Sequence, residues 1–138
     1  MIVKLKKIHP DAQIPKYATP GSAAFDFHAV EDVKILPKTH LMIKTGITME
    51  VPEGHVLQIW DRSGFGAKGL HRFAGVVDSD YREEIKVVIY NSTTQEYEIK
   101  KGDRIAQGIV IPCIQLKFEE ANELNKTQRS GGFGSTGK

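Results

Sequence analysis

Two carboxylates and an aromatic ring lie close together in the segment Gly75–Arg82, GVVDSDYR. Asp78 follows two valines that we expect to be buried, so its carboxylate would be held rigidly at the end of a strand. A rigid carboxylate can orient a water molecule and accept its proton. Asp is also a common turn residue, because its side chain binds the backbone that follows it. Tyr81 either offers its ring to a sugar or packs on the fold. The segment is therefore a candidate for water activation or a plain turn.

Basic, hydroxyl and glycine residues are concentrated in the segment Asp61–Gly69, DRSGFGAKG. An anion such as phosphate needs such donors: the guanidinium of Arg62, the hydroxyl of Ser63 and the unshielded backbone amide at Gly64. Short glycine motifs often arise by chance, so a solvated glycine-rich turn is the alternative. The segment indicates either an anion site or a turn.

Two polar side chains interrupt apolar runs. Asp26 lies between Phe25 and Phe27, where an alternating strand would turn it outward unless a site uses it. Gln107 lies in GDRIAQ, at the start of a long apolar run, and is either a satisfied core amide or a ligand contact. Neither residue distinguishes structure from function by itself.

The last ten residues, RSGGFGSTGK, change abruptly to glycine, hydroxyl and basic side chains. A segment of this composition cannot supply a packed core. Ser135, Thr136 and the basic ends can donate to phosphate, and Phe133 is the single apolar anchor. We expect a pliable arm that folds over an anionic, aromatic ligand.

Short apolar or alternating runs, separated by Gly, Pro and Asp, predict many short strands. The runs span residues 1–8, 24–30, 40–51, 55–60, 74–78, 82–91 and 105–112. The turn residues Asp78–Asp80 predict a hairpin between the runs 74–78 and 82–91. Residues 119–126 have a weakly helical pattern, and residues 67–70 could form one turn. The pattern favours an all-β barrel or sandwich.

Length and composition narrow the class of protein. A chain of 138 residues fits one domain, and a net charge of +2 is too weak to predict a nucleic-acid surface. Cys113 is the one cysteine, so no intramolecular disulfide forms, and its apolar run predicts a buried, inert thiol. No run approaches the roughly 20 apolar residues of a membrane span, and the N-terminus lacks the long apolar core of a signal peptide. We expect a soluble, cytoplasmic protein with neither nucleic-acid nor membrane partners.

In chain order, the stretches AAFDF, DRSGFGAKG, AGVVDSDYREEIKV, GDRIAQ and RSGGFGSTG resemble the five motifs of the trimeric deoxyuridine triphosphatase (dUTPase) family. The resemblance runs from residue 21 to the C-terminus. It implies a jelly-roll-like β barrel, expected over residues 1–127, and a flexible, glycine-rich active-site lid arm over residues 128–138. It also implies a homotrimer in which all three subunits contribute to each active site.

The reaction that this resemblance implies is hydrolysis of dUTP to dUMP and pyrophosphate, which limits uracil incorporation into DNA and supplies dUMP for thymidylate synthesis. Asp78 would hold the water that attacks the α-phosphorus, and Tyr81 would stack under the deoxyribose and exclude a 2′-hydroxyl. The implied cofactor is Mg²⁺, bound mainly by the substrate phosphates, with Asp26 holding one of its waters. A triphosphate is highly charged, so a cation must neutralise part of this charge before a carboxylate-activated water can approach.

The other motif residues acquire binding roles by the same resemblance. The backbone of Gly75, Val76 and Val77 would pair with the polar edge of uracil and leave no room for the thymine methyl group. The phosphates would be contacted by Arg62, Ser63, Gly64 and Gln107. The arm would contribute Arg129, Phe133, Gly134, Ser135 and Thr136, with Phe133 over the uracil and the arginine and hydroxyls at the γ-phosphate. Lys86 is a further candidate contact.

The chain departs from the family pattern at three places. Glu83 follows Asp-Tyr-Arg, where the family usually has glycine, and Arg72 stands where the family often has a small polar group near the base. Gln128 holds the arm position that is commonly arginine, which leaves Arg129 one residue nearer to Phe133. The geometry of the predicted hairpin and the phosphate contact of the arm stay open at this point.

Three other functions compete with dUTP hydrolysis. A deoxycytidine triphosphate deaminase, of the same fold family, needs an acid where this chain has Val88. A regulatory module would keep the nucleotide pocket and bind a protein partner, whereas the intact Asp78 favours catalysis. A purely structural β barrel leaves the hydroxyl-rich arm unexplained.

Overall fold

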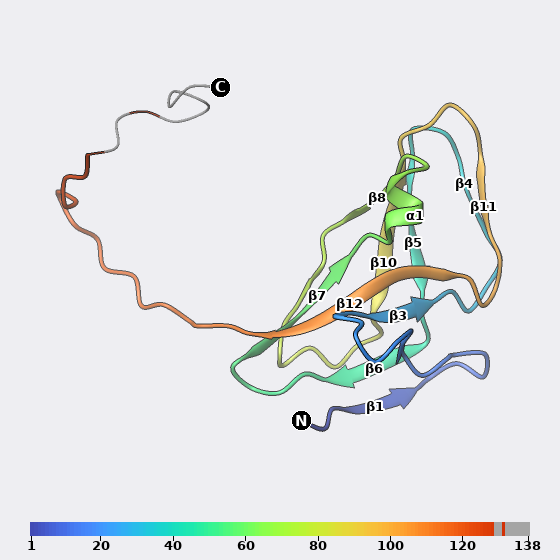
Figure 1. Ribbon diagram of the computed structural model, residues 1–138, viewed down its shortest axis with the longest axis horizontal. Coiled ribbons are helices and arrows are strands. Elements are labelled where there is room, and N and C mark those ends of the chain that lie inside the picture. Colours follow the sequence, from blue (N-terminus) through green and yellow to red (C-terminus); the bar gives the residue numbers. More distant parts are fainter. Residues whose placement is uncertain (129–130, 132–138) are drawn as a thin grey trace.

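The computed structural model describes residues 1–128 and residue 131. Its regular structure is almost entirely short β-strands, with one helical turn (Figure 1). The elements are β1 (Lys4–Lys7), β2 (Lys16–Tyr17), β3 (Phe25–His28), β4 (Val33–Ile35), β5 (His40–Lys44), β6 (Ile47–Glu50), β7 (His55–Trp60), α1 (Ser63–Gly66), β8 (Leu70–Phe73), β9 (Val76–Val77), β10 (Lys86–Asn91), β11 (Tyr97–Ile99) and β12 (Arg104–Pro112). The predicted all-β class is confirmed.

The strands pair antiparallel in four hydrogen-bonded sheets. The largest has the order β2-β3-β12-β7-β9, and a second has the order β5-β10-β8; β1-β6 and β11-β4 are two-stranded. The described strands form jelly-roll-like sheets and not one closed barrel. The long strand β12 lies between β3 and β7, so it aligns residues that are far apart in the sequence.

Alternation along the strands separates the core from the functional face. In β3, Phe25 and Phe27 are buried while Asp26 and His28 are only partly covered. Since successive side chains of a strand point to opposite faces, the two phenylalanines fix the outward direction of Asp26. Strand β10 buries Val87 and Ile89 in the same core cluster. Side chains of both larger sheets therefore share one core.

The apolar run 40–51 forms two strands instead of the single one predicted. The chain breaks between β5 and β6 at Gly46, which has a φ of 66°. A Cβ there would lie 2.7 Å from the Cβ of His9 and 2.8 Å from that of Ala12. Glycine permits both the left-handed backbone and the close approach of the N-terminal segment.

The predicted hairpin around Asp78–Asp80 is wrong. Strand β9 pairs with β7, with Val77 opposite Leu57, whereas β10 pairs with β5 and β8. The segment between β9 and β10 therefore connects two sheets. The valine pair is not buried as expected either, because Val76 is 70% exposed.

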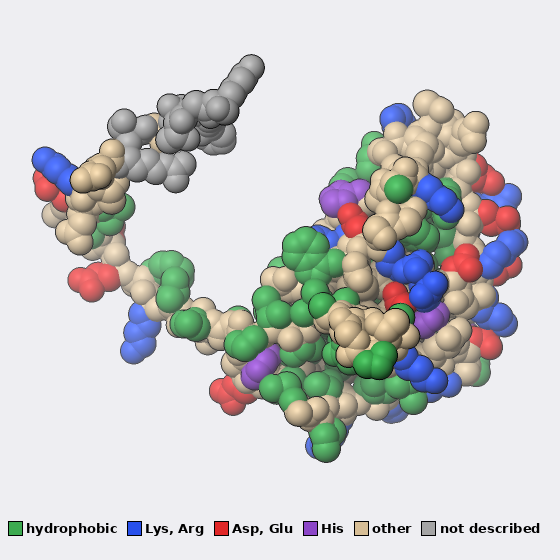
Figure 2. All heavy atoms as spheres, in the orientation of Figure 1, with side chains coloured by type: hydrophobic (Ala, Val, Ile, Leu, Met, Phe, Trp, Pro, Cys, Tyr) green, Lys and Arg blue, Asp and Glu red, His purple; other side chains and the backbone are tan. Residues whose placement is uncertain are grey.

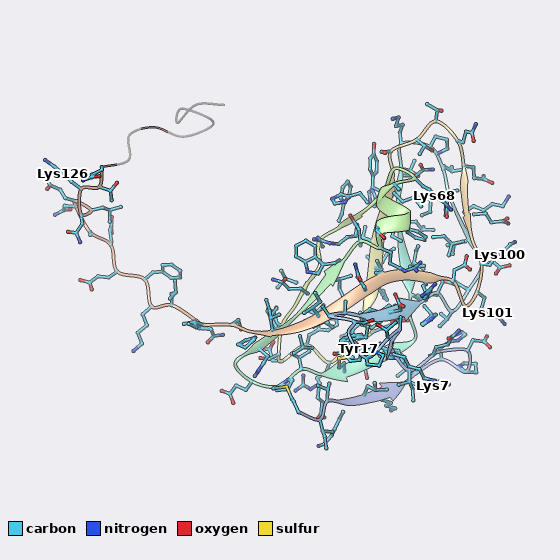
Figure 3. All side chains as sticks on the ribbon, viewed as in Figure 1. Lys7, Tyr17, Lys68, Lys100, Lys101 and Lys126 are labelled. Atoms are coloured by element: carbon cyan, nitrogen blue, oxygen red, sulfur yellow. The ribbon has the colours of Figure 1, made fainter. Side chains whose placement is uncertain are left out.

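Residues 113–128 leave the sheets as an extended segment (Figure 1), with Lys126 far from the strands (Figure 3). Cys113 is exposed, which corrects the predicted buried thiol, because β12 ends at Pro112 and the chain leaves the core there. The weak helix predicted over residues 119–126 is absent. A short helix needs an apolar face packed on a core, and Leu124 is 86% exposed. Within the described residues, no helix is long and apolar enough to cross a membrane.

Candidate functional site

The register of β3, β12 and β7 brings three motifs to one place. Gln107 on β12 lies opposite Asp26 on β3 and opposite Trp60 on β7. Arg62 and Ser63 follow the end of β7 directly. A cavity of about 520 Å³, here called the basic cavity, is lined by these residues and Arg104 among others. Four predicted site residues, Asp26, Arg62, Ser63 and Gln107, therefore meet in one hollow.

Two guanidinium groups hold the carboxylate of Asp26. Arg62 Nε and Arg104 Nη1 each lie 3.3 Å from one of its oxygens. The Asp26 side chain is 16% exposed, and Arg62 also donates from Nη1 to the backbone oxygen of Arg104 at 3.1 Å. The lining also includes Asp61, whose carboxylate contacts His71 and the amide of Arg72. The two guanidinium groups are the donors that an anionic ligand could use in this cavity. In Figure 2 basic side chains gather on this face between α1 and β3.

Arg104 is a residue of this cavity that the sequence interpretation did not assign. It stands in GDRIAQ, but its contact with Asp26 depends on the pairing of β12 with β3. A bulge between Arg104 and Ala106 shifts the register there. One indication of this role was present in the sequence, a basic residue three positions before the predicted site residue Gln107. The local pattern did not indicate the register of β12 against β3, on which the contact depends.

Gln107 already uses part of its hydrogen-bonding capacity. Its Nε2 donates to the backbone oxygen of Asp61 at 2.7 Å. An amide nitrogen carries two hydrogens, so one donor is left for a ligand in the basic cavity. The two alternatives for this residue, core amide and ligand contact, are therefore compatible.

The glycine-rich segment after β7 folds as the single turn α1. The oxygen of Arg62 accepts from the amides of Phe65 and Gly66 at 2.9 and 3.0 Å. Phe65 is buried and anchors the turn, while Ser63 and Gly64 are exposed. The turn thus begins four residues earlier than the turn predicted at 67–70, and it leaves the predicted donors accessible.

A second cavity of about 300 Å³, here called the Asp78 cavity, lies on the other side of β7. Its lining includes six further predicted residues: Gly75, Val76, Val77, Asp78, Tyr81 and Lys86. The predicted residue Gly64 lines neither cavity. Asp78 is exposed at the end of β9. Lys86 lies 3.9 Å from the carboxylate of Glu84. The basic cavity and the Asp78 cavity share no lining residue within the described part of the chain.

The loop that carries Tyr81 is fixed by its own side chains and by the β5–β6 turn. The Tyr81 hydroxyl donates to the backbone oxygen of Glu84 at 2.9 Å. Arg82 Nη1 donates to the oxygens of Ser79 and Tyr81 at 2.7 and 2.9 Å. The Glu84 carboxylate in turn accepts from the amide of Gly46 at 2.9 Å. Glu83, the departure from the family pattern, is exposed and leaves this arrangement intact.

His28 lies beside Asp26 on the outer side of β3. Burial lowers the pKa of its imidazole below the ordinary value of 6.5; the nearby Asp26 carboxylate opposes this shift, and Arg104 and Arg62 add to it. The buried Nδ1 has no hydrogen-bond partner. A neutral imidazole near two guanidinium groups avoids adding a further cation to the site.

The chemistry of the donor set limits how a divalent metal could bind. Among the described residues there is no group of three or more His, Cys, Asp or Glu side chains that could hold a metal ion. Asp26 and Asp61 are the carboxylates that line the basic cavity. Both oxygens of Asp26 contact arginine, and those of Asp61 contact His71 and the Arg72 amide. These residues fit an outer contact through water, and a metal would need most of its ligands from elsewhere.

Five predicted residues of the arm lie outside the described residues. They are Arg129, Phe133, Gly134, Ser135 and Thr136. Gln128, at the edge of the described chain, is exposed.

Comparisons with known proteins give one consistent family. The dUTPase family model matches residues 10–137. The deoxyuridine 5′-triphosphate nucleotidohydrolase of Helicobacter pylori strain P12 is 45% identical over 141 aligned residues, which cover 99% of this chain and 97% of that protein.

Solved structures agree on the fold. A Staphylococcus bacteriophage 80α dUTPase with dUPNHPP superposes with a TM-score of 0.92 at 25% identity, covering 99% of this chain and 98% of the other. A dUTPase mutant from phage phi11 of S. aureus, solved with a structural Mg(II) ion, has a TM-score of 0.83 at 21% identity and covers 89% of this chain and 98% of its own. With the family match and the relative over the whole chain, this chain belongs to the dUTPase family.

Proposed function

We propose that this chain hydrolyses dUTP to dUMP and pyrophosphate. The observation that carries the proposal is the Asp78 cavity, where an exposed carboxylate and a fixed tyrosine ring share a wall with the backbone of β9. Membership of the dUTPase family and the names of its relatives support the same substrate. The basic cavity supplies the guanidinium groups of Arg62 and Arg104, which a triphosphate can contact.

The reaction begins with a water molecule that donates a hydrogen bond to Asp78. As the water oxygen attacks the α-phosphorus, the carboxylate accepts its proton. The bond between the α-phosphorus and the bridging oxygen of the β-phosphate breaks, and pyrophosphate leaves with that oxygen. The water oxygen stays in dUMP. Asp78 is the catalytic residue of this proposal.

Selectivity for the nucleoside is assigned to the walls of the Asp78 cavity. The backbone groups of Gly75–Val77 pair with the polar edge of uracil, and the ring of Tyr81 lies against the deoxyribose. Cytosine has the opposite pattern of donors and acceptors and would leave buried groups unpaired. Such a loss discriminates more strongly than an apolar wall can.

The phosphates are assigned to the basic cavity, with Arg62, Ser63, Gly64 and Gln107 as donors. A magnesium ion would be held mainly by the three phosphates and would neutralise part of their charge. Asp26 would hold it through water, since both oxygens of this cavity carboxylate already contact arginine. A dUTPase mutant from phage phi11 was solved with a structural Mg(II) ion, so that protein of the same fold binds magnesium.

A homotrimer with shared active sites accounts for the separation of the two cavities. One substrate must reach both groups of residues, which on a single chain line different hollows. In a cyclic trimer the Asp78 cavity of one subunit can face the basic cavity of the next. Residues 128–138 of a third subunit then close the site, with Phe133 over the base and Arg129, Gly134, Ser135 and Thr136 near the phosphates.

The test is pyrophosphate release from dUTP, dCTP, dTTP and UTP in the presence of magnesium, carried out in ¹⁸O-labelled water. We expect turnover of dUTP far above that of the other three nucleotides, with the label in dUMP and none in pyrophosphate. No turnover of any nucleotide would favour a regulatory binding module. Release of ammonia from dCTP would favour a deaminase.

A further inference from the structure

We propose that Arg72 is a positioning residue that holds the Ala74–Gly75 turn in place and so sets the selectivity of the Asp78 cavity for uracil over thymine. The inference rests on the proposed function for its substrate. Arg72 lines the cavity, together with the turn and the strand β9 that follows it.

The Ala74–Gly75 turn has an unusual backbone. It joins β8 of one sheet to β9 of another in two residues. Ala74 has a φ of 63° and Gly75 a φ of 130°, and the first of these values is uncommon for a residue with a side chain. A backbone in such a region persists only where its surroundings hold it there.

Arg72 and β7 keep the turn in this conformation from two sides. Arg72 Nη1 donates to the backbone oxygen of Ala74, and the amide of Ile59 donates to the oxygen of Gly75 at 2.8 Å. A Cβ on Gly75 would lie 2.8 Å from the oxygen of Ile59 and 3.0 Å from Arg72 Nη1. The turn is therefore enclosed between the guanidinium and the backbone of β7.

The guanidinium is itself fixed. It lies over the ring of Trp60, 5.1 Å from the ring centroid, and the amide of Arg72 donates to Asp61 Oδ1 at 2.7 Å. Arg72 Nε is buried. A guanidinium stacked on an aromatic ring loses little freedom when it makes a directed hydrogen bond. The arginine is thus a rigid support for the turn, and it acts on substrate through the backbone.

Turn position matters because thymine differs from uracil by one methyl group. The backbone of Gly75–Val77 excludes that methyl group only while the turn stays close to the base. If the hydrogen bond to the Ala74 oxygen is lost, the backbone of Gly75–Val77 can move away from the base. The cavity then admits thymine.

The experiment compares kcat and KM for dUTP and dTTP in the wild type, Arg72→Ala, Arg72→Lys and the control Lys34→Ala. Lys34 is an exposed cation on β4, paired with Glu96 and remote from both cavities. We expect Arg72→Ala to lower the ratio of kcat/KM for dUTP over dTTP by about 10-fold, mainly through a higher kcat/KM for dTTP. Arg72→Lys keeps a cation and a donor and should recover part of the ratio, whereas Lys34→Ala should match the wild type.

Fluorescence of Trp60, the one tryptophan of the chain, gives a readout that needs no turnover. Removal of the stacked guanidinium should shift its emission and raise its quenching by acrylamide. An unchanged selectivity ratio in a folded Arg72→Ala, or equal losses for both nucleotides, would overturn the inference. If Arg72→Ala does not fold, an unchanged ratio and unchanged Trp60 emission in Arg72→Lys would overturn it. A wild type that does not hydrolyse dUTP would instead refute the proposed function, and the fluorescence result would still test the role of Arg72.

Discussion

The lowered pKa of His28 makes the free energy of unfolding depend on pH. Burial lowers the pKa of its imidazole in the folded chain, while the unfolded chain titrates near 6.5. The unfolded state therefore binds the proton at a higher pH than the folded state. The stability contribution is complete above 6.5 and is lost as the pH falls from 6.5 through the lowered folded pKa.

We expect His28→Gln to flatten the acid side of the stability curve. Wild-type and variant Tm values should run in parallel above pH 6.5 and diverge below it, with the wild type falling more steeply. Thermal unfolding over a pH series that brackets 6.5 measures this difference, and NMR titration of the imidazole measures the pKa itself. A titration midpoint at or above 6.5 would contradict the argument.

Glu84 links the loop of Tyr81 to the β5–β6 turn. Its carboxylate accepts from the Gly46 amide, and its backbone oxygen accepts from the Tyr81 hydroxyl. Glu84→Ala leaves the Gly46 amide without its partner and should cost about 1–3 kcal/mol in the free energy of unfolding. Glu84→Gln keeps an oxygen acceptor and should recover most of the loss. Urea unfolding at neutral pH measures both variants.

Glu83→Ala is the matched control for that series, because Glu83 is the exposed neighbour of Glu84. Its effect on the free energy of unfolding should stay within about 0.5 kcal/mol. Equal losses in the Glu83 and Glu84 variants would show that the Gly46 contact contributes nothing specific.

At the scale of elements, the alternation of apolar and polar residues predicts most of the strands that position the site. In β3 the two phenylalanines predict the outward direction of Asp26, and the structure confirms it. Strand partners were not predictable, because they depend on contacts between distant segments. For this reason the sequence suggested a hairpin where β9 pairs with β7, and it did not predict that Arg104 contacts Asp26.

Exposure was predicted less well than strand position. The apolar neighbours of Cys113 indicated burial, but the chain leaves the core after Pro112, and local composition does not encode where a strand departs from its sheet. The motifs of the candidate site were readable because each combines several chemical groups within a few residues. The division of those motifs between two cavities is a property of the topology.

The arm is the element whose role is tested most simply, by deletion of residues 128–138. If it closes the site over the base and phosphates, kcat/KM for dUTP should fall by about 100-fold. The sheets end at Pro112, so the folded part and its Tm should change little. Lys126→Ala, in the described extended segment before the arm, is the control. Wild-type rates in the deletion variant would refute the lid assignment.

For the whole molecule, complementation between inactive variants tests whether sites are shared between subunits. Arg62→Ala damages the basic cavity and Asp78→Asn the Asp78 cavity, so trimers of either variant alone should be inactive. In a cyclic trimer that contains both variants, one site combines an intact Asp78 cavity with an intact basic cavity. Equal mixing and refolding should restore about a quarter of wild-type activity.

The amount of recovered activity distinguishes the arrangements. If each site lay within one chain, every site would carry one of the two substitutions and mixing would restore nothing. Sedimentation of the mixture checks that trimers have formed, and native mass spectrometry checks that they contain both variants, because the two subunits differ in mass.

The most direct test of the account is the turnover of dUTP by Asp78→Asn beside the matched variant Asp80→Asn. Both residues are exposed carboxylates of the same loop, but only Asp78 lines the cavity that holds Tyr81. We predict that Asp78→Asn lowers kcat by about 10²–10⁴-fold, the contribution of a general base, while affinity for a non-hydrolysable dUTP analogue is retained. Asp80→Asn should keep wild-type turnover. Wild-type kcat in Asp78→Asn would contradict the account.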